Sequence, residues 1–226
     1  MFCMKKSVIY LVLLMLNTLN MNSQYKYLAL GDSYTIGESV QDKKTWPYIL
    51  VDQLANKDYE FSKPEVIAKT GWRTEHLLDA INKADLQQES FDLVSLLIGV
   101  NNQYDEKPIE QFTEEFELLL QKAISFNKFG NQTTFVVGIP DYSVTPYAEI
   151  NDKTNADKEV KKYNLIIQRI CKKYDVVFYS LFELSQKMEG QNSMFVEDGL
   201  HPSGDQYHKW VISFRENVFK MLSNVL

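Results

Sequence analysis

The chain has 226 residues, of which 45% are hydrophobic and 24% charged, values that are ordinary for a soluble globular protein. Its formal net charge is −6 and no basic cluster occurs in the sequence, so neither nucleic acid nor an anionic membrane surface is an expected partner. The three histidines and two cysteines form no cluster with metal-ligand spacing, so we expect no metal and no cofactor.

Residues 1–23 have the layout of a secretory signal peptide. Lys5-Lys6 forms a positively charged start, residues 7–16 are mostly apolar, and residues 17–24 are polar. The apolar run is well short of the roughly 20 residues that span a bilayer, so it does not predict a stable membrane anchor. We therefore expect export to the periplasm or the medium, and a single domain formed by residues 24–226.

Short apolar runs alternate with helical patterns along the rest of the chain. The runs are continuous in hydrophobicity, which is typical of parallel strands covered on both faces. Strand–helix alternation implies right-handed β-α-β units, so we predict an α/β fold in which five parallel strands form the middle of three layers. In chain order the elements are strand 26–30, helix 47–54, strand 65–68, helix 74–86, strand 93–98, helix 109–124, strand 134–139, helix 156–174, strand 176–179 and a last helix from Ser203, where Ser203-x-x-Gln206 fits a capping box.

The longest predicted irregular stretch, residues 140–155, follows the fourth strand. The carboxyl ends of parallel strands share one sheet edge, so this stretch is a candidate substrate-facing loop. It contains Tyr142 and Tyr147, and Tyr104 follows the third strand, which makes these tyrosines candidate substrate contacts. Trp72 is either a core aromatic or a wall of the substrate pocket.

Four short motifs follow predicted strands and converge on that sheet edge. They are Gly31-Asp32-Ser33-Tyr34, Thr70-Gly71-Trp72, Gly99-Val100-Asn101-Asn102 and, after the last strand, Asp198-x-x-His201. Because the strands are parallel, residues far apart in the sequence meet at their carboxyl ends. The motifs therefore predict one shared site.

Acyl transfer requires a nucleophile, a base, a group that orients the base, and hydrogen-bond donors for the oxyanion. Ser33, His201 and Asp198 supply the first three. The donors are the backbone N–H groups of Ser33 and Gly71 and the side-chain amide of Asn101. Gly71 suits this role because a residue without Cβ lets a substrate approach the backbone.

These motifs resemble the conserved blocks of the SGNH/GDSL hydrolase family, and the resemblance covers essentially the whole chain after residue 23. It implies a flavodoxin-like five-stranded parallel sheet and hydrolysis of esters or thioesters without a metal. Ser33, Gly71, Asn101 and His201 match the four residues that give the family its name, and Asp198 matches the carboxylate of the last block. Two positions depart from the pattern. Tyr34 stands where leucine is usual, which we interpret as an outward-facing change, and Asn102 stands where aspartate is usual, which affects local hydrogen bonding.

We interpret four other side chains as having no catalytic role. We expect Asp32 to hold its turn through backbone hydrogen bonds. His76 and His208 are expected to face solvent, and Cys171 falls on the apolar face of helix 156–174 as a buried, inert thiol.

The resemblance leaves the substrate open. The expected activity is cleavage of carboxylic esters through an acyl-enzyme intermediate. An exported enzyme without a long apolar lid favours short acyl groups, such as acetyl esters of glycans or lipids. The alternatives are a lysophospholipase or thioesterase with a longer acyl preference, and a non-catalytic glycan-binding relative. A flavodoxin-like nucleotide binder would need a glycine-rich phosphate loop, which Gly31 and Gly37 are too sparse to form.

Overall fold

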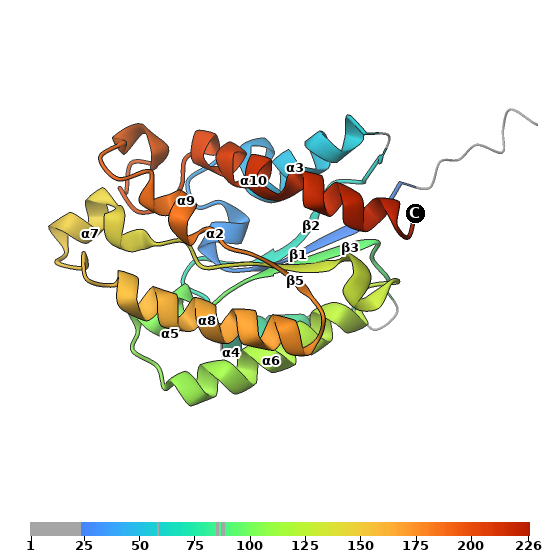
Figure 1. Ribbon diagram of the computed structural model, residues 1–226, viewed down its shortest axis with the longest axis horizontal. Helices are drawn as coiled ribbons and strands as arrows, with labels where there is room; N and C mark the ends of the chain where they lie inside the picture. Colours follow the sequence, from blue (N-terminus) through green and yellow to red (C-terminus); the bar gives the residue numbers. More distant parts are fainter. Residues whose placement is uncertain (1–23, 58, 85, 87–88) are drawn as a thin grey trace, which may run out of the picture.

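The computed structural model describes residues 24–57, 59–84, 86 and 89–226, so the predicted signal peptide lies outside the described residues. Five strands form one parallel sheet in the order β2-β1-β3-β4-β5, as predicted (Figure 1). The order reverses between β1 and β3, which is where open α/β sheets bind ligands. The strands are β1 (Tyr27–Gly31), β2 (Glu65–Ala68), β3 (Leu93–Leu97), β4 (Thr134–Val137) and β5 (Val177–Tyr179).

Two helical layers cover the sheet. Helices α3 (Trp46–Ala55) and α10 (Gly204–Ser223) pack together on one face. The opposite face is covered by α4 (Thr74–Lys83), α6 (Ile109–Ser125) and α8 (Asp157–Lys173) (Figure 1). The predicted three-layer fold is therefore confirmed.

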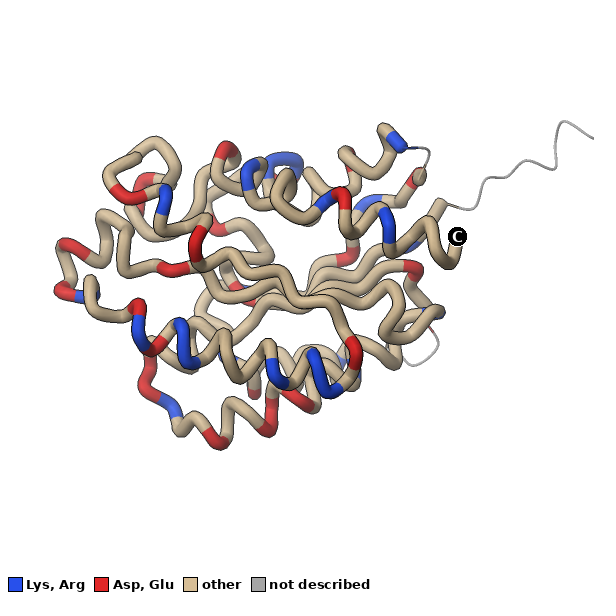
Figure 2. The backbone as a smooth tube through the Cα atoms, in the orientation of Figure 1, with Lys and Arg blue, Asp and Glu red and all other residues tan. Residues whose placement is uncertain are grey.

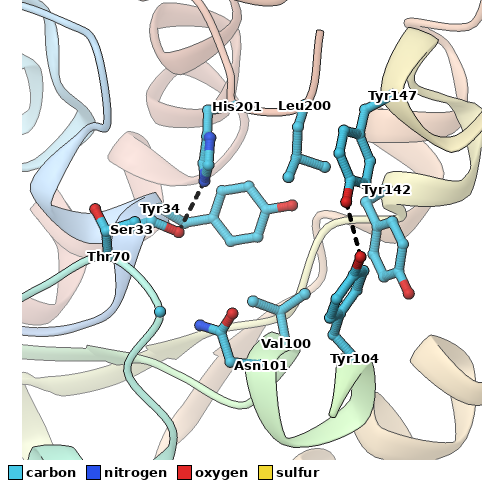
Figure 3. Close-up of a pocket in the computed structure, with 11 residues that line it drawn as sticks. Ser33, Tyr34, Thr70, Val100, Asn101, Tyr104, Tyr142, Tyr147, Leu200 and His201 are labelled. Carbon is cyan, nitrogen blue, oxygen red and sulfur yellow. Dashed lines mark hydrogen bonds between the residues drawn. The ribbon is translucent and has the colours of Figure 1, made fainter. Parts of the chain in front are cut away.

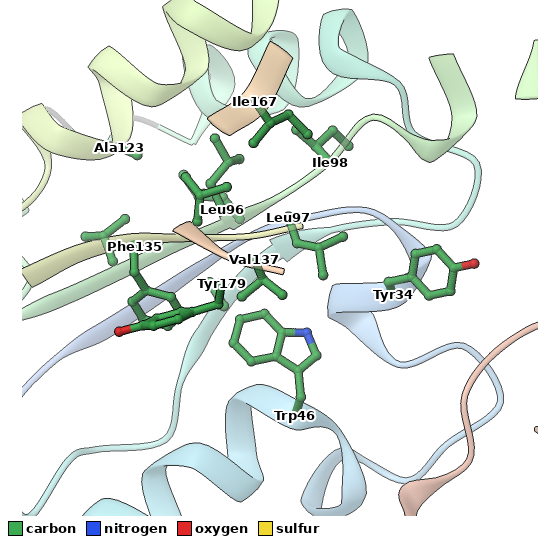
Figure 4. Packing of buried hydrophobic residues seen from close by; sticks show 14 of the residues in the cluster. Tyr34, Trp46, Leu96, Leu97, Ile98, Ala123, Phe135, Val137, Ile167 and Tyr179 are labelled. Atoms are coloured by element: carbon green, nitrogen blue, oxygen red, sulfur yellow. The ribbon is translucent and has the colours of Figure 1, made fainter. Parts of the chain in front are cut away.

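Alternation along the strands divides the core between the two faces (Figure 4). In β3, Leu97 points toward Trp46 of α3, whereas the preceding Leu96 points to the face on which Ile167 of α8 lies. All four side chains are at most 1% exposed. Burial on both faces explains why the strands are continuously apolar in sequence.

The predicted helices and strands are all present, with ends that differ by at most three residues. Ser203 caps α10 as predicted, because its hydroxyl accepts from the backbone N–H of Gln206. The reciprocal half of the capping box is absent, since the N–H of Ser203 donates to the carbonyl of Met194 instead. The described residues also form short helical segments: α2 (Ser33–Ile36), α5 (Val100–Tyr104), α7 (Pro146–Ile150), α9 (Phe182–Gln186), η1 (Asp42–Lys44), η3 (Gly130–Thr133), η4 (Tyr142–Val144) and η5 (Asn192–Met194).

The prediction that residues 140–155 are irregular is wrong, because η4 and α7 lie within them. The carboxylate of Asp141 accepts from the N–H of Ser143 and caps η4. The hydroxyl of Thr145 accepts from the N–H of Ala148 and caps α7, and Pro146 occupies the first turn, where its missing N–H costs nothing. The stretch is therefore ordered into two short helical segments beside the sheet edge.

Charged residues of both signs are interspersed over both helical layers (Figure 2). Among the described residues, no helix combines the length and the apolar character that a membrane crossing requires. Cys171 is 1% exposed, and burial raises the pKa of its thiol to about 12, as expected for an inert core cysteine.

Candidate active site

The turn after β1 places Ser33 at the first position of α2. Gly31 ends the strand, and a Cβ there would lie 2.5 Å from the carbonyl oxygen of Leu97, so only glycine allows β1 and β3 to approach this closely. Asp32 then caps α2 by accepting from the N–H of Tyr34 (3.0 Å). This cap fixes the turn that presents Ser33, and it agrees with the structural role predicted for Asp32.

The structure brings Ser33, His201 and Asp198 into one hydrogen-bonded chain (Figure 3 shows the first pair). The Nδ1 atom of His201 lies 2.6 Å from Oδ2 of Asp198, and its Nε2 atom lies 2.9 Å from Oγ of Ser33. Because an ionised carboxylate only accepts, Nδ1 carries the proton and Nε2 is left to accept from the serine hydroxyl. This is the tautomer that a general base needs.

Asp198 also shapes the loop that carries the histidine. Its Oδ1 atom accepts from the backbone N–H groups of Leu200 (2.7 Å) and His201 (2.9 Å). Partial burial alone would raise the pKa of this carboxyl, but the hydrogen bonds from His201 and the two backbone groups outweigh it and hold the pKa below its ordinary value. The carboxylate therefore stays ionised beside the imidazole at neutral pH.

Gly71 and Asn101 line the same pocket as Ser33. Gly71 has φ +77°, a conformation in which residues with a side chain are strained. One N–H of the Asn101 amide donates to the carbonyl oxygen of Trp72 (2.9 Å). That bond fixes the amide plane, and the second N–H of the same nitrogen remains for a ligand.

Asn102 explains how the departure from the usual aspartate is accommodated. The side chain is fully buried; its Oδ1 accepts from the N–H of Thr74 (3.1 Å), and its Nδ2 donates to the Thr74 hydroxyl (2.7 Å). The hydroxyl in turn donates to Glu115. An amide can both accept from and donate to Thr74, so Asn102 ties the segment after Gly71 to α5.

A second contact ties the same two segments. The guanidinium of Arg73 pairs with Glu75 and with Asp105, which follows α5. The backbone N–H of Arg73 donates to Nδ1 of His76, which caps α4. The prediction that His76 faces solvent is therefore wrong, because its ring is half-buried and satisfies a helix N-terminus. His208 is exposed, as predicted.

The pocket at the sheet edge has a volume of about 170 Å³, and Figure 3 shows the side chains that surround it. Tyr104, Tyr142 and Tyr147, the candidate substrate contacts, all line it. Trp72 does not line it and packs, partly buried, against the core, which favours the core over the pocket wall. The lining residues are Ser33, Tyr34, Thr70, Gly71, Val100, Asn101, Tyr104, Tyr142, Tyr147, Leu200 and His201.

The interpretation of Tyr34 as outward-facing is wrong. The side chain is 3% exposed, and its ring packs edge-on against His201 (centroids 5.7 Å apart) and Trp210 (6.0 Å). In Figure 3 it extends from beside Ser33 along the pocket. Sequence reasoning also missed Thr70, Val100 and Leu200, although all three lie inside the recognised motifs, where flanking positions are a usable signal.

Asp32 gives the site a pH-dependent stability. Complete burial raises the pKa of its carboxyl from 3.8 to about 7, despite hydrogen bonds from backbone N–H groups, and Oδ2 has no partner among the described residues. Between about pH 4 and pH 7 the folded protein holds a proton that the unfolded chain has lost, so the free energy of unfolding falls as the pH rises. The fall is up to about 4 kcal/mol. We expect urea titrations at several pH values to show this fall in the free energy of unfolding for the wild type and not for Asp32→Asn. The same dependence on pH in both proteins would contradict the raised pKa of Asp32.

Comparison with known protein families identifies the family of this chain. The sequence model of the GDSL-like Lipase/Acylhydrolase family matches residues 29–209, a span that includes every motif described above. The chain belongs to this family. No curated protein sequence matches this GDSL hydrolase.

Solved structures share the fold of this GDSL hydrolase at low sequence identity. The psychrotrophic esterase EstA from Pseudoalteromonas sp., in a structure inhibited by monoethylphosphonate, is 17% identical, with 89% of this chain and 100% of EstA covered and a TM-score of 0.65. A lipase/acylhydrolase from Enterococcus faecalis is 18% identical, with 87% and 96% covered and a TM-score of 0.66. The acetylxylan esterase Axe2 from Geobacillus stearothermophilus is 14% identical, with 86% and 94% covered and a TM-score of 0.64.

Proposed function

We propose that this GDSL hydrolase cleaves carboxylic esters of short acyl groups through an acyl-enzyme on Ser33. The observation that carries the proposal is the hydrogen-bonded chain from Ser33 through His201 to Asp198, at the mouth of a pocket that Gly71 and Asn101 also line. One sheet edge thereby carries the nucleophile, the base, the carboxylate that orients the base, and the donors for the oxyanion.

In the first half of the reaction Nε2 of His201 takes the hydroxyl proton as Oγ of Ser33 attacks the ester carbonyl carbon. The carbonyl oxygen becomes an oxyanion and accepts from the N–H groups of Ser33 and Gly71 and from the free N–H of Asn101. Asp198 stabilises the imidazolium that forms. Collapse of the tetrahedral intermediate breaks the bond to the alcohol oxygen, which takes the proton from His201.

The second half repeats these steps with water. His201 takes a proton from a water molecule whose oxygen attacks the acyl carbon, and the same three donors receive the oxyanion. Collapse breaks the bond to Oγ of Ser33, which recovers a proton from His201 as the carboxylic acid leaves. The chain's own residues account for each proton transfer.

The size of the pocket supports a short acyl group. Its volume of about 170 Å³ is close to that of an engineered cavity of about 150 Å³ that binds benzene, so it holds about six non-hydrogen atoms. Axe2, which shares this fold, is an acetylxylan esterase, and this supports an acetyl substrate. We also propose export, which is supported by the layout of residues 1–23 and would bring the enzyme to acetylated glycans or envelope lipids.

A series of p-nitrophenyl esters of increasing chain length tests this proposal. We expect kcat/KM to be highest for acetate or butyrate and to fall at least roughly tenfold by octanoate, because two or more methylenes then exceed the space in the pocket, and fitting them displaces packed side chains at a cost of about 1–3 kcal/mol. The series shares one leaving group, so differences report the acyl end. A maximum at dodecanoate or longer would instead favour the lysophospholipase or thioesterase alternative. Hydrolysis of no ester would favour the non-catalytic glycan-binding alternative.

A further inference from the structure

The end of the pocket opposite Ser33 is formed by two tyrosines from different elements (Figure 3). Tyr104 is the last residue of α5, and Tyr147 lies in α7. Their hydroxyl oxygens are 2.7 Å apart, which is a hydrogen bond across the pocket. We call this pair the tyrosine bridge.

The Tyr104 half of the tyrosine bridge is held in place by side chains behind its ring. The ring of Tyr104 packs against that of Tyr142 (centroids 6.2 Å apart), and the ammonium group of Lys153 lies 5.0 Å from the Tyr104 ring centre. Tyr142 is itself 2% exposed, and its hydroxyl donates to Gln103 (2.8 Å). Tyr104 itself is 36% exposed, so its ring has packed side chains on one side and solvent on the other.

The backbone of Tyr147 is tied to the loop of the proposed base. Its N–H donates to the carbonyl oxygen of Gly199 (3.0 Å), which lies between Asp198 and His201 in the sequence. A Cβ on Gly199 would lie only 3.2 Å from Cβ of Pro146, so the loop and the start of α7 are in close contact. The bridge thus keeps a fixed position relative to His201 on one side and to α5, which carries Asn101, on the other.

The reaction geometry directs the acyl chain toward the tyrosine bridge. In the tetrahedral intermediate the carbon bound to Ser33 carries the oxyanion, the alcohol oxygen and the acyl chain. The oxyanion faces Gly71 and Asn101, and the alcohol oxygen must lie within reach of His201. The remaining substituent points along the apolar side of the pocket, where Val100 and Leu200 lie between Ser33 and the bridge (Figure 3).

We propose that the tyrosine bridge determines acyl-chain specificity by closing the acyl end of the pocket. This inference rests on the proposed function and adds the residues that set the length limit. The rings of Tyr104 and Tyr147 provide the bulk, and the hydrogen bond between them holds α5 and α7 together across the gap.

Truncation of one half of the bridge tests the proposal. Tyr147→Ala opens the end of the pocket, so the ratio of kcat/KM for p-nitrophenyl octanoate to that for the acetate is expected to rise roughly tenfold, the gain from burying two further methylenes. Tyr147→Phe retains the ring and loses only the hydroxyl, so it is expected to keep the wild-type ratio within about threefold. Tyr104→Ala removes the other half and is expected to act in the same direction as Tyr147→Ala.

Two controls separate the effect of the bridge from general effects on the fold. Ile150→Ala changes a side chain on the same helix that is 83% exposed and does not line the pocket, and it is expected to leave both rates unchanged. Acetate esters of alcohols of increasing size are measured with the same variants, and their relative rates are expected not to change. The melting temperature of each variant identifies any that fails to fold, and Tyr104→Ala then carries the test.

Two results would overturn the inference while leaving the proposed function intact. One is an unchanged octanoate-to-acetate ratio in folded Tyr147→Ala and Tyr104→Ala that still hydrolyse acetate. The other is a changed preference for the alcohol with a constant acyl preference, which would place the bridge at the leaving-group side. Failure of the proposed function is a different observation, namely a wild-type protein that hydrolyses no ester in the series.

Discussion

Replacement of Ser33 by alanine is expected to lower kcat for p-nitrophenyl acetate roughly 10⁶-fold. The variant keeps the pocket but has no oxygen to attack the ester, and His201 has no hydroxyl from which to take a proton. The loss of one buried hydroxyl leaves the α2 turn capped by Asp32, so the melting temperature is expected to change little. Initial rates of purified wild type and variant, measured side by side, test this prediction.

Asp198→Ala provides a graded comparison for the same assay. The carboxylate orients the imidazole and touches no substrate atom, so its loss is expected to cost about 10⁴-fold in kcat, less than the loss of Ser33. The double variant Ser33→Ala/Asp198→Ala is expected to be no slower than Ser33→Ala alone, because the residues act as one unit. Equal, mild losses in both single variants would contradict the proposed triad.

Asn101→Ala is expected to lower kcat about 10²–10³-fold, with a small effect on KM, because its free N–H bonds to an oxyanion that exists only in the transition state and intermediates. The steady-state parameters for p-nitrophenyl acetate separate the two effects. Asn101→Asp is the matched control, since it keeps the shape of the side chain and replaces the donor by a negatively charged acceptor. We expect it to be at least as slow as Asn101→Ala.

The amide of Asn101 also donates to the carbonyl of Trp72, so a loss of stability alone is a competing explanation. Thermal melts of both variants distinguish the two. A variant that loses stability and retains the wild-type kcat would show that Asn101 only holds the segment around Gly71. A folded variant with a reduced kcat would support the role in oxyanion binding.

The sheet and its flanking helices were predictable because the hydrophobic pattern follows directly from burial. Leu96 and Leu97 are consecutive and both buried, on opposite faces, which only a strand covered on both sides allows. Residues 140–155 were misjudged because the cues there are polar and local. Asp141 and Thr145 are helix-capping residues, and Pro146 is favoured in a first turn, so the signal for η4 and α7 was present in a stretch without hydrophobic periodicity.

The features of the site also fall into those that were predictable from the sequence and those that were not. Ser33, His201 and Asp198 were identifiable because their chemistry depends on residue type and on the end of a parallel strand. The burial of Tyr34 was not predictable, because it follows from packing against His201 and Trp210, which come from the other end of the chain. The contacts of Asn102 with Thr74 and the pairing of Tyr104 with Tyr147 likewise join segments that the sequence alone does not bring together.

Identification of the residue that an activated phosphonate ester modifies tests the central claim most directly. The purified protein is incubated with an ethyl p-nitrophenyl phosphonate, and the adduct is located by peptide mass spectrometry. We predict one adduct per chain on Ser33, loss of ester hydrolysis in proportion to labelling, and no adduct in Ser33→Ala. Inactivation that accompanies an adduct on another residue, or full activity in a protein fully labelled at Ser33, would contradict the account.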